Sequence, residues 1–250
     1  MTNDAVALQS DALDGDGAAS NDDGQSRLPP ELLIWFAPSF PTGGFAFSQG
    51  LETAAAEGFV TDRESLLGWL NALLESGSIR NDLIFASLSY RAAARAPDAD
   101  IDLAELIQWS LALQPTAERA REAVQLGRNF RDAVLAGWPQ LKRAFASLGD
   151  EDPTYPVASG LAAASLGLPL EATLAAYVES GIANACSAAV RLSVIGQFDG
   201  VRIQSGLRDD VERAIVGART ARIDDVSSTT FTADILSMRH ETQMTRLFQS

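Results

Sequence analysis

The sequence contains one cysteine, Cys186, and one histidine, His240. A lone cysteine cannot form an internal disulfide, so we expect a reducing compartment, the cytoplasm. Transition-metal sites usually gather several His or Cys ligands. We therefore expect no dedicated metal site in one copy of the chain, and Cys186 to be a small core residue. A pair of His240 side chains across a dimer axis could still bind a metal weakly.

Basic residues are also scarce, with 19 Lys and Arg against 33 Asp and Glu and a net charge of −14. No Lys/Arg stripe appears, which argues against nucleic acid and an anionic membrane surface as partners. The N-terminus has no basic stretch followed by an apolar run, so no signal peptide is expected. The longest weakly polar run, 172–190, is rich in Ala and Ser and contains Glu179 and Asn184, which favours a buried helix over a membrane span.

Familiar catalytic motifs are missing as well. A P-loop needs Gly-x-x-x-x-Gly-Lys-Ser/Thr after a strand, and Gly43-Gly44 has neither the lysine nor the strand. Ser48 does not fit the Gly-x-Ser-x-Gly spacing of a nucleophile elbow, and a cap on the following helix explains it better. We therefore expect no catalytic residue and no cofactor.

Two zones differ in composition. Residues 1–27 contain six Asp residues and one cation, Arg27, among mostly small and polar residues. Such a segment cannot bury enough apolar surface to offset its ordering entropy, so we predict a disordered acidic tail; a docking role for it stays open. Residues 28–250 form the second zone, which we predict to be one helical domain.

Apolar residues in this second zone recur at helical spacing, with no strand alternation and no internal repeat. We predict an all-α fold, a single compact bundle of about ten helices around a long Ala-rich helix. Thr61 and Glu64 have the spacing of a capping box. The expected helices cover roughly 30–35, 48–58, 81–95, 115–137, 140–148, 155–166, 169–195 and 200–218. A further helix follows the capping box and includes Leu66 to Leu74, another starts at Asp100 or Asp102 and runs to 114, and the last starts near Thr232 or Asp234.

Residues 37–52 combine fixed and permissive backbone positions. Pro38 and Pro41 fix two φ angles, Gly43-Gly44 permits angles that other residues avoid, and three phenylalanines accompany them. A loop pinned in this way often carries a specific function. A buried turn between helices fits the same composition.

The last helix carries a polar pattern. Arg239, Gln243 and Arg246 recur at helical spacing, while Ile235, Leu236 and Met238 can cover the core. Arginine forks suit carboxylates, so this stripe suggests protein recognition, although a solvated face would look the same.

Five blocks in order resemble the family of urease accessory proteins called UreF. The first reads Ala-Pro-Ser-Phe-Pro-Thr-Gly-Gly-Phe-Ala-Phe-Ser-Gln-Gly-Leu-Glu, and together the blocks are 37–52, 121–128, 155–161, 189–197 and 238–250. The resemblance covers nearly all of residues 30–250. Phe47 and Met244 stand where the pattern usually has Tyr, and Thr154 replaces a frequent His, so we expect each position to lose a polar group.

The resemblance implies a non-catalytic scaffold that forms a homodimer, binds a UreD/UreH-like accessory protein and recruits a UreG-like GTPase to apo-urease for GTP-dependent nickel insertion. Two alternatives are an enzyme with an unfamiliar helical active site and a regulator of another metalloenzyme. By the same resemblance the partner-binding residues are Pro41, Gly43, Gly44, Phe45, Phe47, Ser48, Glu52, Arg239, His240, Glu241, Gln243, Arg246 and Phe248.

Overall fold

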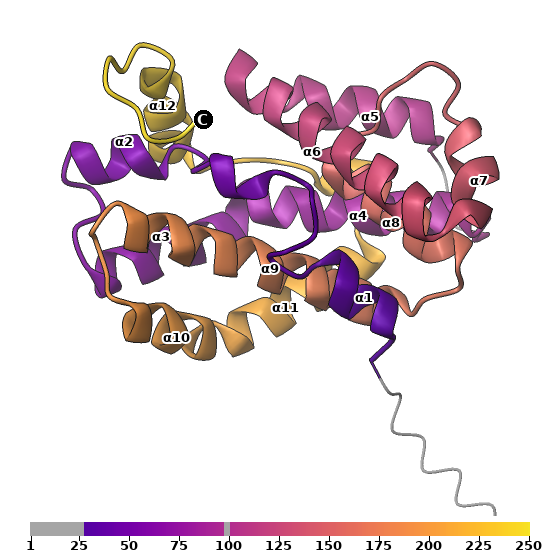
Figure 1. Cartoon of the computed structure of the whole chain (residues 1–250), viewed down its shortest axis with the longest axis horizontal. Coiled ribbons are helices and arrows are strands. Elements are labelled where there is room, and N and C mark those ends of the chain that lie inside the picture. Colours follow the sequence, from indigo (N-terminus) through magenta and orange to yellow (C-terminus); the bar gives the residue numbers. More distant parts are fainter. Residues whose placement is uncertain (1–27, 98–100) are drawn as a thin grey trace, which may run out of the picture.

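The computed structural model describes residues 28–97 and 101–250, and within them the regular structure is entirely helical (Figure 1). This confirms the predicted all-α class. The predicted tail, 1–27, lies outside the described residues. The elements are α1 Pro30–Trp35, η1 Gly44–Ala46, α2 Leu51–Ala56, α3 Arg63–Ser76, α4 Ser78–Ala93, α5 Leu103–Ala112, α6 Ala117–Gly137, η2 Pro139–Leu141, α7 Lys142–Ala146, α8 Tyr155–Ser165, α9 Leu170–Arg191, α10 Gln197–Gly206, α11 Arg208–Thr220, η3 Ile223–Asp225 and α12 Phe231–His240.

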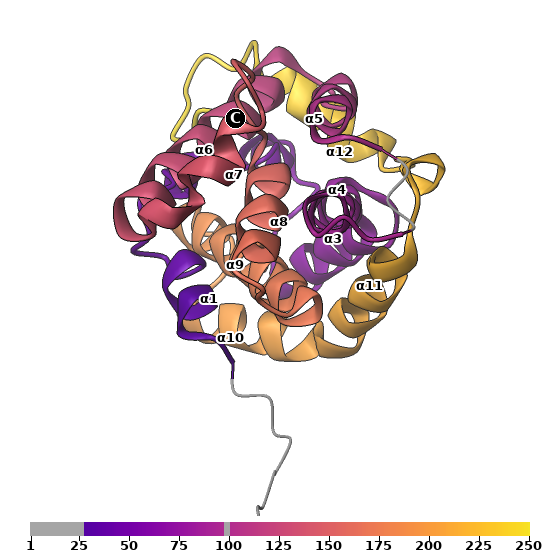
Figure 2. The same ribbon diagram turned by 90° about the vertical axis from the view of Figure 1, so that its right-hand side faces the viewer.

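Helices α4 and α8 lie in the middle of the bundle, and the other helices surround them (Figure 2). Eight of the eleven residues of α8 are buried, because its Ala, Ser and Gly side chains let neighbouring backbones come close. The closest approach is at Gly160, where a Cβ atom would lie 2.2 Å from the Ala86 carbonyl oxygen of α4. Glycine at this position sets the distance between the two helices.

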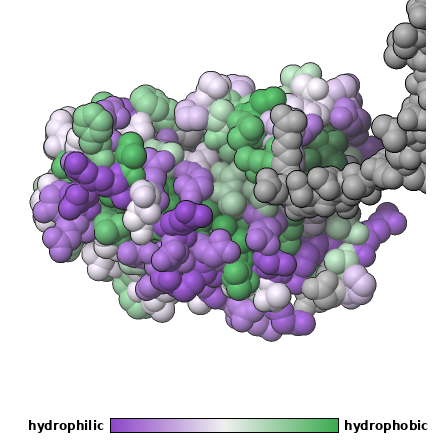
Figure 3. Space-filling view, turned by 90° about the horizontal axis from the view of Figure 1, so that it is seen from below, coloured by the Kyte–Doolittle hydropathy of each residue, from purple (hydrophilic) through white to green (hydrophobic). Residues whose placement is uncertain are grey.

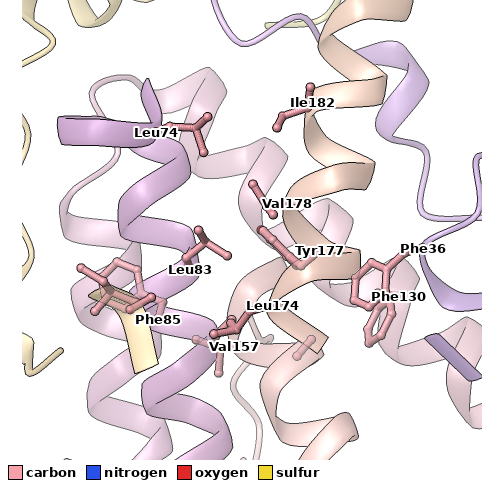
Figure 4. Close-up of a cluster of buried hydrophobic side chains, with 14 of the residues drawn as sticks. Phe36, Leu74, Leu83, Phe85, Phe130, Val157, Leu174, Tyr177, Val178 and Ile182 are labelled. Carbon is pink, nitrogen blue, oxygen red and sulfur yellow. The ribbon is translucent and has the colours of Figure 1, made fainter. Parts of the chain in front are cut away.

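The long Ala-rich helix is α9. It spans Leu170–Arg191, shorter than the predicted 169–195, because Ser193 adopts a positive φ of 61° just beyond it. Its apolar residues, including Tyr177 and Ile182, point toward α4, where Leu83 faces them (Figure 4). The apolar residues that recur at the predicted helical spacing thus form the main core.

An aromatic cluster fixes the start of the 37–52 loop. Phe130 of α6 is fully buried and packs edge-on against Trp35 and Tyr155, with ring centroids 5.7 and 5.5 Å away. Phe36 stacks on the same ring at 6.3 Å, and Phe40 contacts it at 5.7 Å. Such aromatic pairs add to the free energy gained by burial. The loop therefore begins from a rigid base.

Two helix boundaries differ from the prediction. The cap of α3 is Asp62, not Thr61: the Asp62 Oδ1 atom accepts the Ser65 N–H at 2.9 Å, and Ser65 Oγ accepts the Asp62 N–H at 3.0 Å. Aspartate is the stronger N-cap, so the register moves by one residue. The single helix predicted over 200–218 is wrong, because the chain breaks into α10 and α11 at the fully buried Leu207, directly after Gly206.

The outer surface is mixed. Hydrophilic residues cover much of the face shown in Figure 3, and hydrophobic residues gather in smaller areas of it. Among the helices in the described part of the chain, none combines the length and apolar character needed to cross a bilayer.

The contact at Gly160 gives a stability prediction. Gly160→Ala forces a methyl group against the α4 backbone and should lower the free energy of unfolding by about 1–3 kcal/mol. Gly181→Ala is the matched control, because a Cβ at this helical position meets nothing within 4 Å. It should raise stability by about 0.5–1 kcal/mol through better helix propensity. Urea unfolding measures both, and equal shifts would contradict the close packing of α4 on α8.

Candidate partner-binding site

The 43–52 stretch and residues 241–250, here called the C-terminal segment, pair with each other although they lie about two hundred residues apart. The main-chain oxygen of Ser250 accepts the N–H groups of Ser48 and Gln49 at 2.8 and 3.1 Å, and the Gln249 N–H donates to the Ala46 oxygen at 2.9 Å. Ser48 Oγ also donates to the Ser250 oxygen at 2.6 Å. In Figure 1 the C-terminal segment accordingly lies beside α2.

Ser48 is only a partial cap. Its Oγ accepts the Glu52 N–H at 3.3 Å, but α2 begins at Leu51, after Gly50. Gly50 has a φ of 82°, and a Cβ atom there would lie 3.2 Å from the Ser237 nitrogen of α12. Glycine is thus required both for the backbone angle and for the close approach of α12.

The Glu52 carboxylate connects α2 to the C-terminal segment. It is 6% exposed and accepts the N–H groups of Leu247 at 2.6 Å and Phe248 at 3.0 Å. His240 Nε2 lies 3.2 Å from the same carboxylate. A buried carboxylate needs such donors, since an unpaired buried charge is costly.

His240, expected among the partner-binding residues, does not face solvent, because its side chain is 0% exposed. Its Nδ1 atom lies 2.8 Å from Glu118 Oε2 of α6, and its Nε2 atom faces Glu52. Both neighbours are acceptors, so an imidazole with a proton on each nitrogen donates to both. Although burial opposes it, the hydrogen bonds from His240 and Arg246 lower the pKa of Glu118.

The predicted Arg239–Gln243–Arg246 stripe does not exist, since α12 ends at His240 and the chain turns back over α2. The three side chains diverge. Arg239 pairs with Glu57, Gln243 Oε1 accepts the Thr53 hydroxyl at 3.0 Å, and Arg246 pairs with Glu118. Of the residues expected to cover the core, only Leu236 is buried, while Ile235 and Met238 are about half exposed, at 47% and 49%.

Arg191, from the last turn of α9, contacts both of the paired segments. Its guanidinium carbon lies 3.5 Å from the centre of the Phe45 ring and 4.2 Å from that of Phe248. Phe45 is 63% exposed and Leu247, next to Phe248, is 61% exposed. The Arg191 patch is defined as Arg191, the exposed Phe45, the buried Phe248 and its exposed neighbour Leu247.

The thirteen residues expected to bind partners thus fall into two groups. The buried members are Phe47, Ser48, Glu52, His240 and Phe248, and they hold the two segments together. The more accessible ones are Pro41, Gly43, Gly44, Phe45, Arg239, Glu241, Gln243 and Arg246. Sequence analysis did not single out Glu118. Leu247 lies in the 238–250 block and Arg191 in the 189–197 block of the UreF resemblance, but neither is among the thirteen residues.

One cavity adjoins the 43–52 stretch and α12, and a second lies at the termini of α3, α9 and α10. One, of about 40 Å³, is lined by residues including Asp82, Arg119 and Asp234, and is far below the ~300 Å³ of ordinary small-molecule sites. The other is an open depression of about 720 Å³ bordered by the α3, α9 and α10 termini, with Asp62, Glu64 and Asp199 at its rim. Cys186 contacts neither; it is 4% exposed, and burial raises its pKa to about 11.

Glu52 and Glu57 provide a matched test of the buried pairing. Glu52→Gln places an amide NH₂ among three donors, so the C-terminal segment should loosen at a cost of about 1–3 kcal/mol. Hydrogen exchange at the Leu247 and Phe248 amides should speed up correspondingly. Glu57→Gln breaks only the exposed pair with Arg239 and should cost less than about 1 kcal/mol. Unchanged exchange in Glu52→Gln would refute the role of this carboxylate.

Asp82 gives a pH prediction. Burial is the main cause that raises its pKa to about 6, against the opposing effects of Arg119 and the Tyr177 hydroxyl. The folded state therefore holds this proton more tightly than the unfolded state, so the free energy of unfolding falls as the pH rises from about 4 to about 6 and stays lower above it. Asp82→Asn should match the wild type near pH 4 and be more stable at pH 7 to 8, by at most about 3 kcal/mol. Chemical unfolding across this pH range measures the difference, and a gap of the same size at every pH would contradict it.

Comparison with known proteins identifies the family. The family model described as UreF matches residues 60–208. The chain is 45% identical over 236 residues to the urease accessory protein UreF of Xanthobacter autotrophicus, covering 94% of this chain and 96% of that protein. It is 44% identical to the UreF of Azorhizobium caulinodans, covering 90% and 98%, and 42% identical to that of Agrobacterium fabrum, covering 88% and 95%. The chain therefore belongs to the UreF family of urease accessory proteins.

Proposed function

We propose that this chain is a non-catalytic scaffold for urease maturation. It binds a UreD/UreH-like accessory protein and, with it, recruits a UreG-like GTPase to apo-urease, where GTP hydrolysis accompanies nickel insertion. Family membership supports the role in urease maturation. The observation that supports a binding role is the rigid pairing of the 43–52 stretch with the C-terminal segment, which holds Phe45 and Leu247 in solvent.

Several features favour a scaffold over the alternative of a helical enzyme. His240 is enclosed between two carboxylates, and the Cys186 thiol is buried with a raised pKa. Neither residue can reach a substrate in this arrangement. Within residues 28–97 and 101–250, no group of three or more His, Cys, Asp or Glu side chains is arranged to hold a metal ion. Nickel is accordingly the cargo of the assembly in this proposal, not a ligand of this chain.

The proposal includes a homodimer and a cytoplasmic location. The exposed face of α12 supports the first, because Phe231, Ile235 and Met238 recur at helical spacing and are 68%, 47% and 49% exposed. The lone, unpaired Cys186 fits a reducing compartment.

Leu247→Asp tests the binding surface. The side chain is 61% exposed, so its replacement should change the melting temperature little. It should prevent co-purification with the UreD/UreH-like protein and abolish urease activation in cells that lack the wild-type chain, because a charge enters an apolar contact. Phe198→Asp, at an 80% exposed position on α10, is the matched control and should retain both.

The outcomes separate the hypotheses. A folded Leu247→Asp protein that activates urease normally would place the contact elsewhere. Turnover of a small substrate by the purified chain would favour the enzyme alternative. Light scattering of the wild type should give twice the 26.5 kDa chain mass if the homodimer is correct.

A further inference from the structure

We propose that the Arg191 patch recognises a carboxylate group of the partner protein, with the Arg191 guanidinium as the hydrogen-bond donor and the exposed Phe45 and Leu247 as neighbouring apolar side chains. This inference rests on the proposed function and names the chemistry of the contact. The partner group is an Asp or Glu side chain, or a terminal carboxylate, next to apolar residues.

The guanidinium is held in place but has no anionic partner within the described chain. Its central carbon lies 3.5 Å from the centre of the Phe45 ring and 4.2 Å from that of the Phe248 ring. Nε donates to the Ser187 carbonyl oxygen over a long 3.4 Å, and Nη2 is enclosed without an acceptor. Arg119 and Arg246, in the neighbouring network, each pair with a glutamate.

A ligand that provides an acceptor for this guanidinium would therefore gain binding free energy. An enclosed charged donor without an acceptor is unfavourable, and stacking on aromatic rings compensates only in part. The same burial lowers the pKa of Arg191 from its ordinary value, as expected for a charge without a counter-ion. A carboxylate is the matching group, because a charge-assisted hydrogen bond from a guanidinium to a carboxylate is stronger than one to a neutral acceptor.

The exposure of Arg191 and the character of the residues around it fit a protein ligand. Arg191 itself is partly exposed, and the flanking Phe45 and Leu247 side chains are 63% and 61% exposed. Binding hot spots typically combine aromatic and arginine side chains near the centre of an interface. The buried Phe248 ring and Arg191, with apolar side chains nearby, have this composition. On a chain of net charge −14, a cation held in this way also lets an acidic partner segment bind where the overall charge would repel it.

The test measures affinity for the purified UreD/UreH-like protein by calorimetry at several salt concentrations. Arg191→Lys keeps the charge but loses the planar fork, and should weaken binding at least about tenfold. Arg191→Met removes the charge and should weaken it at least about thirtyfold, with a shallower dependence on salt. Arg213→Met is the matched control: Arg213 is exposed on α11, pairs with Asp210 and should bind like the wild type.

Each outcome bears on a different statement. If the wild type binds and both Arg191 variants bind within twofold of it, the carboxylate contact is overturned while the proposed function survives. If the wild type does not bind the UreD/UreH-like protein, the proposed function fails and this inference fails with it. Should Arg191→Met melt well below the control, the Arg191→Lys variant decides; tenfold weaker binding with an unchanged melting temperature supports the contact, and wild-type binding refutes it.

Discussion

Burial of the Glu52 carboxylate is the constraint on which the functional region depends. A charge that is 6% exposed is tolerated only where donors surround it, and here the donors are two backbone N–H groups and His240. The His240 donor belongs to α12, and the two N–H donors belong to the C-terminal segment. The Glu52 carboxylate, in the short helix α2, therefore binds parts of the chain that lie far from it in sequence. Glu118 supplies the second carboxylate for His240 and also binds Arg246, which extends the same network to α6. Two glutamates, one histidine and one arginine thus join α2, α6, α12 and the C-terminal segment through one polar network.

This network explains why several polar side chains of the region are buried while two large apolar ones are exposed. Polar side chains that would ordinarily face water, Ser48 and His240 among them, are turned inward to join the 43–52 stretch to the C-terminal segment. Phe45 and Leu247 are left outside on a backbone that hydrogen bonds hold on both sides. A partner that binds there meets a surface already ordered, so little conformational entropy is lost on association.

The sequence predicts local structure well and long-range pairing poorly. Apolar spacing, Pro and Gly gave the all-α class and most helices, since these signals act within a few residues. The end of α12 could not be predicted this way. Arg239, Gln243 and Arg246 have helical spacing, but hydrogen bonds to Glu52 and Ala46, some two hundred residues away, favour a turn after His240. The burial of His240 depends on the same distant glutamates, and a lone histidine on an amphipathic helix carries no sign of them.

The three departures from the family pattern have different structural consequences. Met244 is fully exposed, so the loss of a tyrosine hydroxyl there leaves the packing untouched, whereas Phe47 is 3% exposed and its hydroxyl would need a buried partner. The expectation that Thr154 loses a polar group is wrong, because its Oγ1 accepts the Ser110 hydroxyl at 2.6 Å in the buried junction of α5 with α8. A departure at a buried position is therefore compatible with the fold only when the neighbouring side chain provides the matching group. At an exposed position such as Met244, the same kind of change alters the surface without disturbing the packing beneath it.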